Sequence, residues 1–231
     1  MGTLTKIKNK NNHEHLVAVQ AGSVTLSGNL VIPTGAQGIV LFAHGSGSSR
    51  LSPRNRYVAK VLNDAGLGTL LFDLLTSREE SIDRHSLHLR FDIGLLASRL
   101  KGATDWIAQH AKTHRLNIGY FGASTGSAAA LIAAAEKPDM ISVIVSRGGR
   151  PDLAGTALTR VQTPTLLIVG GNDPMVIDLN QDAFAKISAE KHLEIVPGAT
   201  HLFEESGALE QVAQLASQWF QKHLNAANTA S

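Results

Sequence analysis

Apolar and amphipathic segments alternate from residue 38 onward, and this alternation constrains the fold more than any other feature of the sequence. The apolar runs are short and uninterrupted, which is typical of parallel strands buried on both faces. Each longer stretch between them has the spacing of an amphipathic helix. We therefore expect an α/β fold, with a doubly wound, mostly parallel sheet and helices on both faces. The expected strands cover 38–43, 68–74, 117–121, 141–145, 165–169 and 192–196, and the expected helices cover 54–65, 91–109, 126–135, 174–188 and 209–224.

The N-terminal part of the chain has a different pattern. Residues 16–20 and 24–33 alternate apolar and polar side chains, which predicts an antiparallel hairpin or edge pair that opens the sheet. Residues 1–15 are polar, and we expect a tail there. Because 231 residues suffice for one well-buried core and are few for two, we expect a single domain over residues 16–231.

One connecting segment, residues 76–90, is longer than the others and is polar and charged. We interpret it as a surface loop, with a small flap over a functional site as the alternative. Within it, Glu79 and Glu80 are interpreted as a solvated helix start. The segment leaves no room for a separate cap domain.

Composition excludes several classes of protein. No apolar run approaches the roughly 18 residues that cross a bilayer, so no membrane span is expected. The chain has no cysteine, which excludes disulfides, thiolate metal sites and a thiol nucleophile. No apolar core follows the polar start, so we expect a cytoplasmic protein. A net charge of +2 argues against nucleic acid as a partner and favours a small neutral or mildly anionic substrate. The pattern predicts no particular oligomeric state.

The sequence Gly122-Ala-Ser124-Thr-Gly126 lies between an expected strand and an alanine-rich expected helix. This context is typical of the nucleophile elbow, in which a serine occupies a strained strand-to-helix turn and small neighbours allow close backbone approach. We predict Ser124 as a nucleophile, with a plain glycine-rich turn as the alternative.

A serine hydroxyl needs a base and an acid that orients it, in the chain order serine, acid, histidine. Asp173 follows a buried strand, where ligand-facing residues of such sheets gather, and we predict it as the acid. It could instead only cap the helix at Pro174, and Asp178 is a weaker substitute. His201 follows the next strand and is the predicted base, with a structural histidine as the alternative; His192 begins that strand and is a poorer candidate.

Acyl transfer also needs donors for an oxyanion. The backbone N–H of Thr125, after the nucleophile, is the first predicted donor, and the N–H of Ser46 in the loop His44-Gly-Ser-Gly is the second. His44 is then a scaffold residue. Residues 45–50 could alternatively hold a phosphate, although they lack the third glycine of the dinucleotide motif and the Lys-Ser/Thr of a P-loop.

Other polar residues allow weaker predictions. Arg147 or Arg150 could hold a substrate carboxylate, but a surface turn in which one of these arginines pairs with Asp152 is at least an equal alternative. Asp73 ends a strand and is interpreted as structural. The pair His85-x-x-His88 lacks a third ligand, so no metal site is predicted.

Together these motifs resemble the dienelactone hydrolase family of α/β-hydrolases over about residues 20–224. The resemblance implies the α/β-hydrolase fold and hydrolysis of an ester, thioester or lactone through an acyl-enzyme, without a cofactor. The family's named activity uses a cysteine in the elbow, whereas this chain has Ser124, so a general carboxylesterase or acyl hydrolase is preferred over dienelactone hydrolysis. The motifs that carry the resemblance are His44-Gly-Ser-Gly, Gly122-Ala-Ser-Thr-Gly126, Gly171-Asn-Asp173 and Gly198-Ala-Thr-His201-Leu-Phe.

The sequence therefore predicts a serine hydrolase. A transacylase or a cofactor-free perhydrolase would use the same three residues and differ only in the acceptor. A non-catalytic binding module with the same fold is a further alternative, because fold does not fix function.

Overall fold

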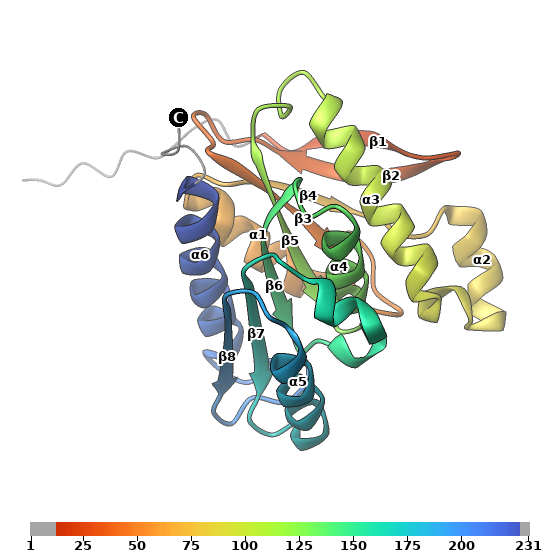
Figure 1. Cartoon of the computed structure of the whole chain (residues 1–231). Helices are drawn as coiled ribbons and strands as arrows, with labels where there is room; N and C mark the ends of the chain where they lie inside the picture. The colour runs from red at the N-terminus through yellow and green to blue at the C-terminus, as the bar shows by residue number, and fades with distance from the viewer. Residues whose placement is uncertain (1–12, 227–231) are drawn as a thin grey trace, which may run out of the picture.

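A computed structural model of the chain describes residues 13–226 and contains one eight-stranded sheet (Figure 1). The strand order is β1-β2-β4-β3-β5-β6-β7-β8. β2 pairs antiparallel with β1 and β4, and all other neighbours are parallel. The strands are β1 (His15–Ala21), β2 (Val24–Val31), β3 (Gly38–Ala43), β4 (Gly68–Phe72), β5 (Asn117–Ala123), β6 (Ile141–Arg147), β7 (Thr165–Gly170) and β8 (Lys191–Val196).

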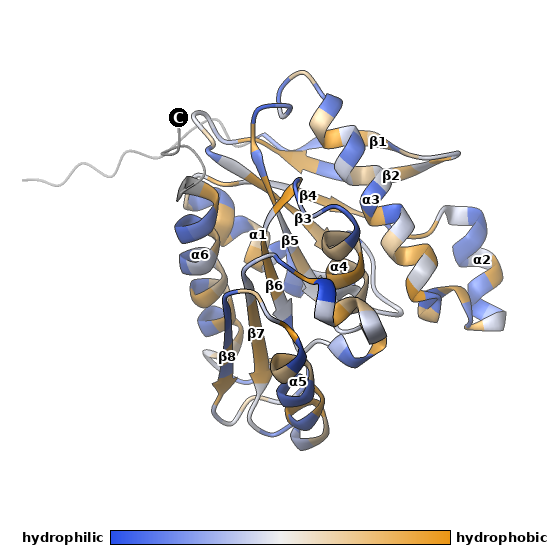
Figure 2. Cartoon of the chain, in the orientation of Figure 1, coloured by the Kyte–Doolittle hydropathy of each residue, from blue (hydrophilic) through white to orange (hydrophobic). Residues whose placement is uncertain are grey.

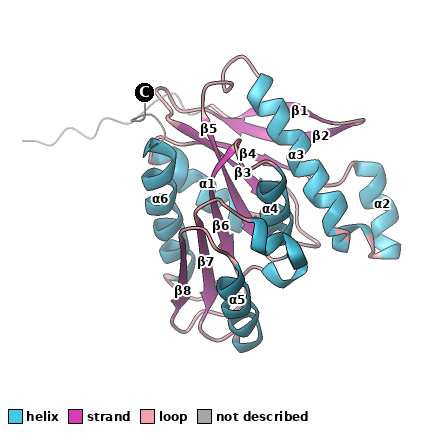
Figure 3. Cartoon of the chain, viewed as in Figure 1, coloured by secondary structure: helices cyan, strands magenta, loops and turns pink. Residues whose placement is uncertain are grey.

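Helices cover both faces of this sheet (Figure 3). α1 and α6 pack on one face, and α3, α4 and α5 pack on the other. The helical segments are α1 (Pro53–Asp64), α2 (Ser77–Ser86), η1 (Leu89–Phe91), α3 (Ile93–Gln109), α4 (Thr125–Glu136), η2 (Pro151–Arg160), α5 (Pro174–Lys186) and α6 (Ala208–Ala226).

Strand β3 shows why the sequences of the central strands are uninterrupted apolar runs. All six of its residues are buried. Ile39, Leu41 and Ala43 join the core under α3 and α4, whereas Val40 and Phe42 join the core under α1 and α6. Because successive side chains point to opposite faces, a strand covered on both sides must be apolar throughout. The predicted fold class is confirmed.

The interpretation of residues 76–90 as a loop is wrong, because they contain α2 and most of η1. Thr76 and Glu79 form a capping box at the start of α2, and Asp83 is its one buried residue. Figure 2 shows α2 as mostly hydrophilic, in contrast to the central strands. A helix without an apolar stripe lacks the periodicity by which helices are recognised, although the capping box was visible in the sequence.

The remaining expectations concern the ends of the chain and insertions. Residues 1–12 of the predicted tail lie outside the described residues, and the strand that follows begins at His15. No cap domain is inserted within residues 13–226. No helix in that range is both long and apolar enough to cross a bilayer.

α3 crosses β1 at Gly102, and substitution of this glycine tests how closely the two elements pack. A Cβ at Gly102 would lie 2.6 Å from Ala21 Cα, whereas a Cβ at Gly94 of the same helix meets nothing closer than 3.4 Å. We expect Gly102→Ala to lower the free energy of unfolding by about 1–3 kcal/mol through overpacking. Gly94→Ala should leave it unchanged or raise it by up to about 1 kcal/mol, because alanine is the better helix former. Equal stability of the two variants in urea titrations would contradict this packing.

Candidate active site

Ser124 occupies a strained turn between β5 and α4. Its φ is 51° and its ψ is −121°, a conformation that costs free energy for any residue other than glycine. The turn is tight: a Cβ at Gly122 would lie 2.5 Å from Ser127 Cα, and a Cβ at Gly126 would lie 2.1 Å from Ala43 O. The glycines on either side of Ser124 are therefore required by close backbone contact, as predicted for a nucleophile elbow.

The backbone after β6 holds this turn from the other side. The Ser124 N–H donates to Arg147 O at 3.2 Å, and the Arg150 N–H donates to Ser124 O at 3.1 Å. The Asn180 side chain in α5 donates in turn to Gly149 O at 3.0 Å. These bonds fix the strained serine to a neighbouring strand end, and sequence analysis did not identify this support.

Asp173 and His201 are hydrogen-bonded at 2.7 Å, between Asp173 Oδ2 and His201 Nδ1. Asp173 follows β7 and His201 lies between β8 and α6. The Asp173 side chain makes no capping bond to α5, so the alternative in which it only caps that helix is not supported. An acceptor at Nδ1 keeps the proton on that nitrogen and leaves Nε2 available as a base.

The loop that carries His201 is tied down locally. The Thr200 N–H donates to Glu205 Oε2 at 3.0 Å, and the Thr200 hydroxyl donates to Glu205 Oε1 at 2.6 Å. Phe203 is buried with a φ of 56°. His192, the competing histidine, is instead hydrogen-bonded to Glu194 on β8.

Ser124 and His201 line one cavity of about 230 Å³. Within the described residues no hydrogen bond joins the two side chains. Such bonds are often long in ligand-free enzymes and tighten when substrate binds. The cavity brings together segments that are far apart in the sequence, and its lining comprises Gly45, Ser46, Ser48, Ser52, Arg54, Ala123, Ser124, Arg147, His201 and Leu202.

The two predicted oxyanion donors lie on adjacent segments. The Ser46 N–H donates to the Thr125 hydroxyl at 3.0 Å, so this donor is engaged within the protein. Thr125 is buried and begins α4, where backbone N–H groups have no partner within the helix. The hydrogen bond fixes the loop after β3 to the turn that carries Ser124.

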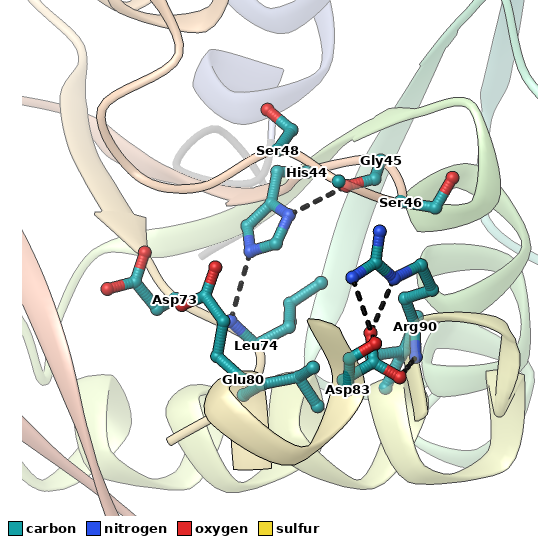
Figure 4. A pocket seen from close by; sticks show the side chains of 12 residues that line it. His44, Gly45, Ser46, Ser48, Asp73, Leu74, Glu80, Asp83 and Arg90 are labelled. Carbon is teal, nitrogen blue, oxygen red and sulfur yellow. Dashed lines mark hydrogen bonds and ion pairs between the residues drawn. The ribbon is translucent and has the colours of Figure 1, made fainter. Parts of the chain in front are cut away.

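His44 anchors the same loop from below (Figure 4). Its Nε2 accepts from the Leu74 N–H at 3.1 Å, and its Nδ1 lies 2.9 Å from Gly45 O, to which it donates. Both ring nitrogens are satisfied only in the neutral form, and burial lowers the pKa of His44 from its ordinary value of 6.5. Asp73 binds the side chain and backbone N–H of Arg50 at the far end of the loop. His44 and Asp73 are thus structural, as interpreted.

Residues His44 and Asp73 also face a second, small cavity of about 30 Å³ (Figure 4). The helix α2 contributes Asp83 to its wall, and Asp83 pairs with Arg90. By the same measure it is much smaller than the cavity that Ser124 and His201 line.

The two arginines proposed for substrate binding differ in surroundings. Arg150 is paired with Asp152 through two hydrogen bonds of 2.9 and 2.7 Å, which is the alternative that the sequence left open. Arg147 is 7% exposed and lines the cavity beside Ser124. Arg54 lines it too and was not identified from the sequence. Within residues 13–226 no cluster of three or more potential metal-ligating side chains occurs.

Comparison with known proteins gives the family. A family model described as "Dienelactone hydrolase family" matches residues 26–230, which is most of the chain. The chain belongs to the dienelactone hydrolase family. A solved structure of a dienelactone hydrolase from Anabaena variabilis is 64% identical, with a TM-score of 0.92 over 93% of this chain and 99% of that one.

Two further comparisons show a more distant structural relative and a longer curated relative. Est1E from Butyrivibrio proteoclasticus is 15% identical with a TM-score of 0.74, covering 90% of this chain and 98% of that one, which shows a shared fold. A Mycobacterium tuberculosis protein with the provisional name phosphoribosyl transferase is 59% identical over 208 residues, which are 90% of this chain and 46% of that protein. The chain thus spans about half the length of this relative.

The neutral state of His44 generates a pH prediction. Below pH 6.5 the unfolded chain protonates this histidine while burial resists protonation in the folded state, so the unfolded state binds more protons. The stabilising contribution of His44 is therefore complete above pH 6.5 and is lost as the pH falls toward its lowered folded pKa. The stability advantage of the wild type over His44→Gln should shrink between about pH 7.5 and about pH 5. A constant difference in urea titrations across that range would contradict it.

Proposed function

We propose that this member of the dienelactone hydrolase family is a serine hydrolase that cleaves a carboxylic ester, thioester or lactone through an acyl-enzyme. Ser124 is the nucleophile, His201 the base and Asp173 the acid that orients it. The observation that supports this most strongly is the 2.7 Å bond between Asp173 and His201, on a histidine that shares a cavity with the strained Ser124.

In the first half-reaction the Ser124 oxygen attacks the acyl carbon while His201 Nε2 takes the hydroxyl proton. The carbonyl oxygen becomes an oxyanion, stabilised by the N–H groups of Thr125 and Ser46. The Ser46 N–H would then exchange its bond with the Thr125 hydroxyl for one with the oxyanion, or share it. Collapse breaks the bond to the leaving group, which receives the proton from His201 and departs.

In the second half-reaction water replaces the alcohol. His201 takes a proton from water as it attacks the acyl carbon, and the second oxyanion forms at the same donors. Collapse breaks the ester bond to Ser124, whose oxygen regains the proton, and releases the acid. Asp173 remains ionised throughout and stabilises the imidazolium that forms in each half.

Two other activities use the same residues. A transacylase passes the acyl group to an alcohol, and a perhydrolase passes it to hydrogen peroxide; analysis of products formed with each acceptor separates both from hydrolysis. A binding module would need no activated serine. The strain held at Ser124 favours catalysis over binding, because such strain persists where the surrounding structure enforces it and gathers at active sites.

The provisional name of the mycobacterial relatives describes a different activity. This chain matches 46% of their length, and the dienelactone hydrolase family model matches residues 26–230 of this chain. We therefore propose that the hydrolase chemistry belongs to the part of those proteins that corresponds to this chain, and we do not assign it phosphoribosyl transfer.

Removal of the triad side chains tests the proposal. Ser124→Ala should lower kcat for a short nitrophenyl ester by about 10⁶-fold because it removes the nucleophile, and Asp173→Asn by about 10⁴-fold because His201 is no longer held in the right tautomer. His192→Ala, an exposed histidine on β8, is the matched control and should retain activity. Thermal melting curves establish that each variant is folded. Full turnover by folded Ser124→Ala would refute the assignment.

The bond between Ser46 and Thr125 gives a second test. Thr125→Val keeps the backbone N–H but removes the hydroxyl that holds the Ser46 loop. We expect kcat to fall by about tenfold with little change in KM, because donor placement matters most in the transition state. Thr125→Ser restores the hydroxyl and should recover most of the activity. Equal kcat for the valine variant and the wild type would show that the bond plays no part.

A further inference from the structure

Arg147 is a buried cation with no acceptor among residues 13–226. The residue is 7% exposed, and within the described part of the chain its buried Nε and Nη1 atoms have no hydrogen-bond partner. Burial, and next the positive charge of Arg54, lower the pKa of Arg147 to about 10, which still leaves it charged at neutral pH. A largely buried charge with no counter-ion and two unpaired guanidinium nitrogens is costly, so an anion would complete its environment.

Arg54 adds a second guanidinium from another element. It is the second residue of α1, and its Nη1 donates to Glu204 Oε1 at 2.7 Å. Glu204 is well exposed, with 62% of its side chain accessible, so this pair is weak. The buried Nε of Arg54 has no hydrogen-bond partner among the described residues. Both arginines thus retain unused donors.

Both side chains line the cavity that contains Ser124 and His201. Arg147 ends β6 and pairs with Ala123, the residue before the nucleophile, so its place next to Ser124 is set by the sheet register. Ser48 and Ser52 contribute to the same lining. Ser52 is also the N-cap of α1, a helix of 12 residues whose N-terminus carries partial positive charge.

We propose that Arg147, Arg54 and the start of α1 bind a phosphate-type group of the substrate, so that the preferred ester carries a phosphate monoester or phosphonate close to its scissile bond. This rests on the proposed function, because it places the group relative to the ester attacked by Ser124. The donors come from β6, from α1 and from the loop before α1. A tetrahedral group with three free oxygens can accept from three directions, whereas one guanidinium satisfies both oxygens of a planar carboxylate.

Binding of inorganic phosphate tests the subsite without requiring turnover. In calorimetric titrations of the wild type we expect saturable binding, and Arg147→Met and Arg54→Met should each weaken it by about 10- to 100-fold, the loss typical of charge-assisted hydrogen bonds. Arg160→Met removes an exposed arginine outside this cavity and is the matched control, with unchanged affinity. Arg147→Lys should bind with intermediate affinity because it keeps the charge but loses the planar fork.

Thermal stability gives an independent readout. Arg147→Met replaces a buried cation that is unpaired, so the substitution breaks no ion pair. Without phosphate we therefore expect this variant to fold and to melt no lower than the wild type. Added phosphate should raise the melting temperature of the wild type but not of Arg147→Met. The same phosphate should inhibit hydrolysis of a neutral ester competitively in the wild type.

Three results would overturn the proposal: no phosphate binding by the wild type, phosphate affinity unchanged in Arg147→Met, or acetate binding as tightly as phosphate. A failure of the subsite is distinguishable from a failure of the hydrolase. If only the phosphate site is wrong, turnover of neutral esters still depends on Ser124 but is insensitive to phosphate. If only the hydrolase assignment is wrong, phosphate binding remains intact, including in Ser124→Ala, while no ester is cleaved.

Discussion

The strained backbone of Ser124 is the constraint on which the rest of the site depends. A serine with a φ of 51° is unfavourable in isolation, so its neighbours must enforce it. Close contacts at Gly122 and Gly126 leave no room for side chains, and hydrogen bonds to the backbone of residues 147 and 150 hold the turn from the side. Because β3, β5, β6, β7 and β8 are parallel, their carboxyl ends meet at one edge, and every other functional group approaches Ser124 from there.

Polar groups near this edge are divided between those that are satisfied within the protein and those that are not. His44, Asp73 and Arg150 find partners in the chain and fix loops. Asp173 is satisfied by His201, which leaves the other ring nitrogen for chemistry. Arg147 and Arg54 differ from these groups, because both line the cavity beside Ser124 and have buried donor atoms without an acceptor in the described part of the chain. Hydrogen bonding thus distinguishes the polar groups that hold loops in place from those that remain available to a ligand.

Much of this arrangement could be predicted from the sequence, because the strongest signals are local. Uninterrupted apolar runs located the central strands, and a glycine-flanked serine between strand and helix located the elbow. The prediction failed at α2, whose residues lack an apolar stripe, and it missed Arg54 altogether. Arg54 reaches the cavity that Arg147 lines because α1 packs against β4 and α6, and no local sequence pattern encodes this proximity of residues far apart in the chain. The Ser46 to Thr125 bond was hidden for the same reason.

The central claim is that the fold activates one particular hydroxyl, and covalent labelling with a fluorophosphonate tests it most directly. Such a reagent reacts with a serine whose proton is taken by a neighbouring base, and peptide mass spectrometry identifies the modified residue. The account predicts a single adduct per chain, on Ser124, and slow or absent labelling when His201 is replaced by alanine. Labelling of a different serine, or equal labelling rates with and without His201, would contradict it.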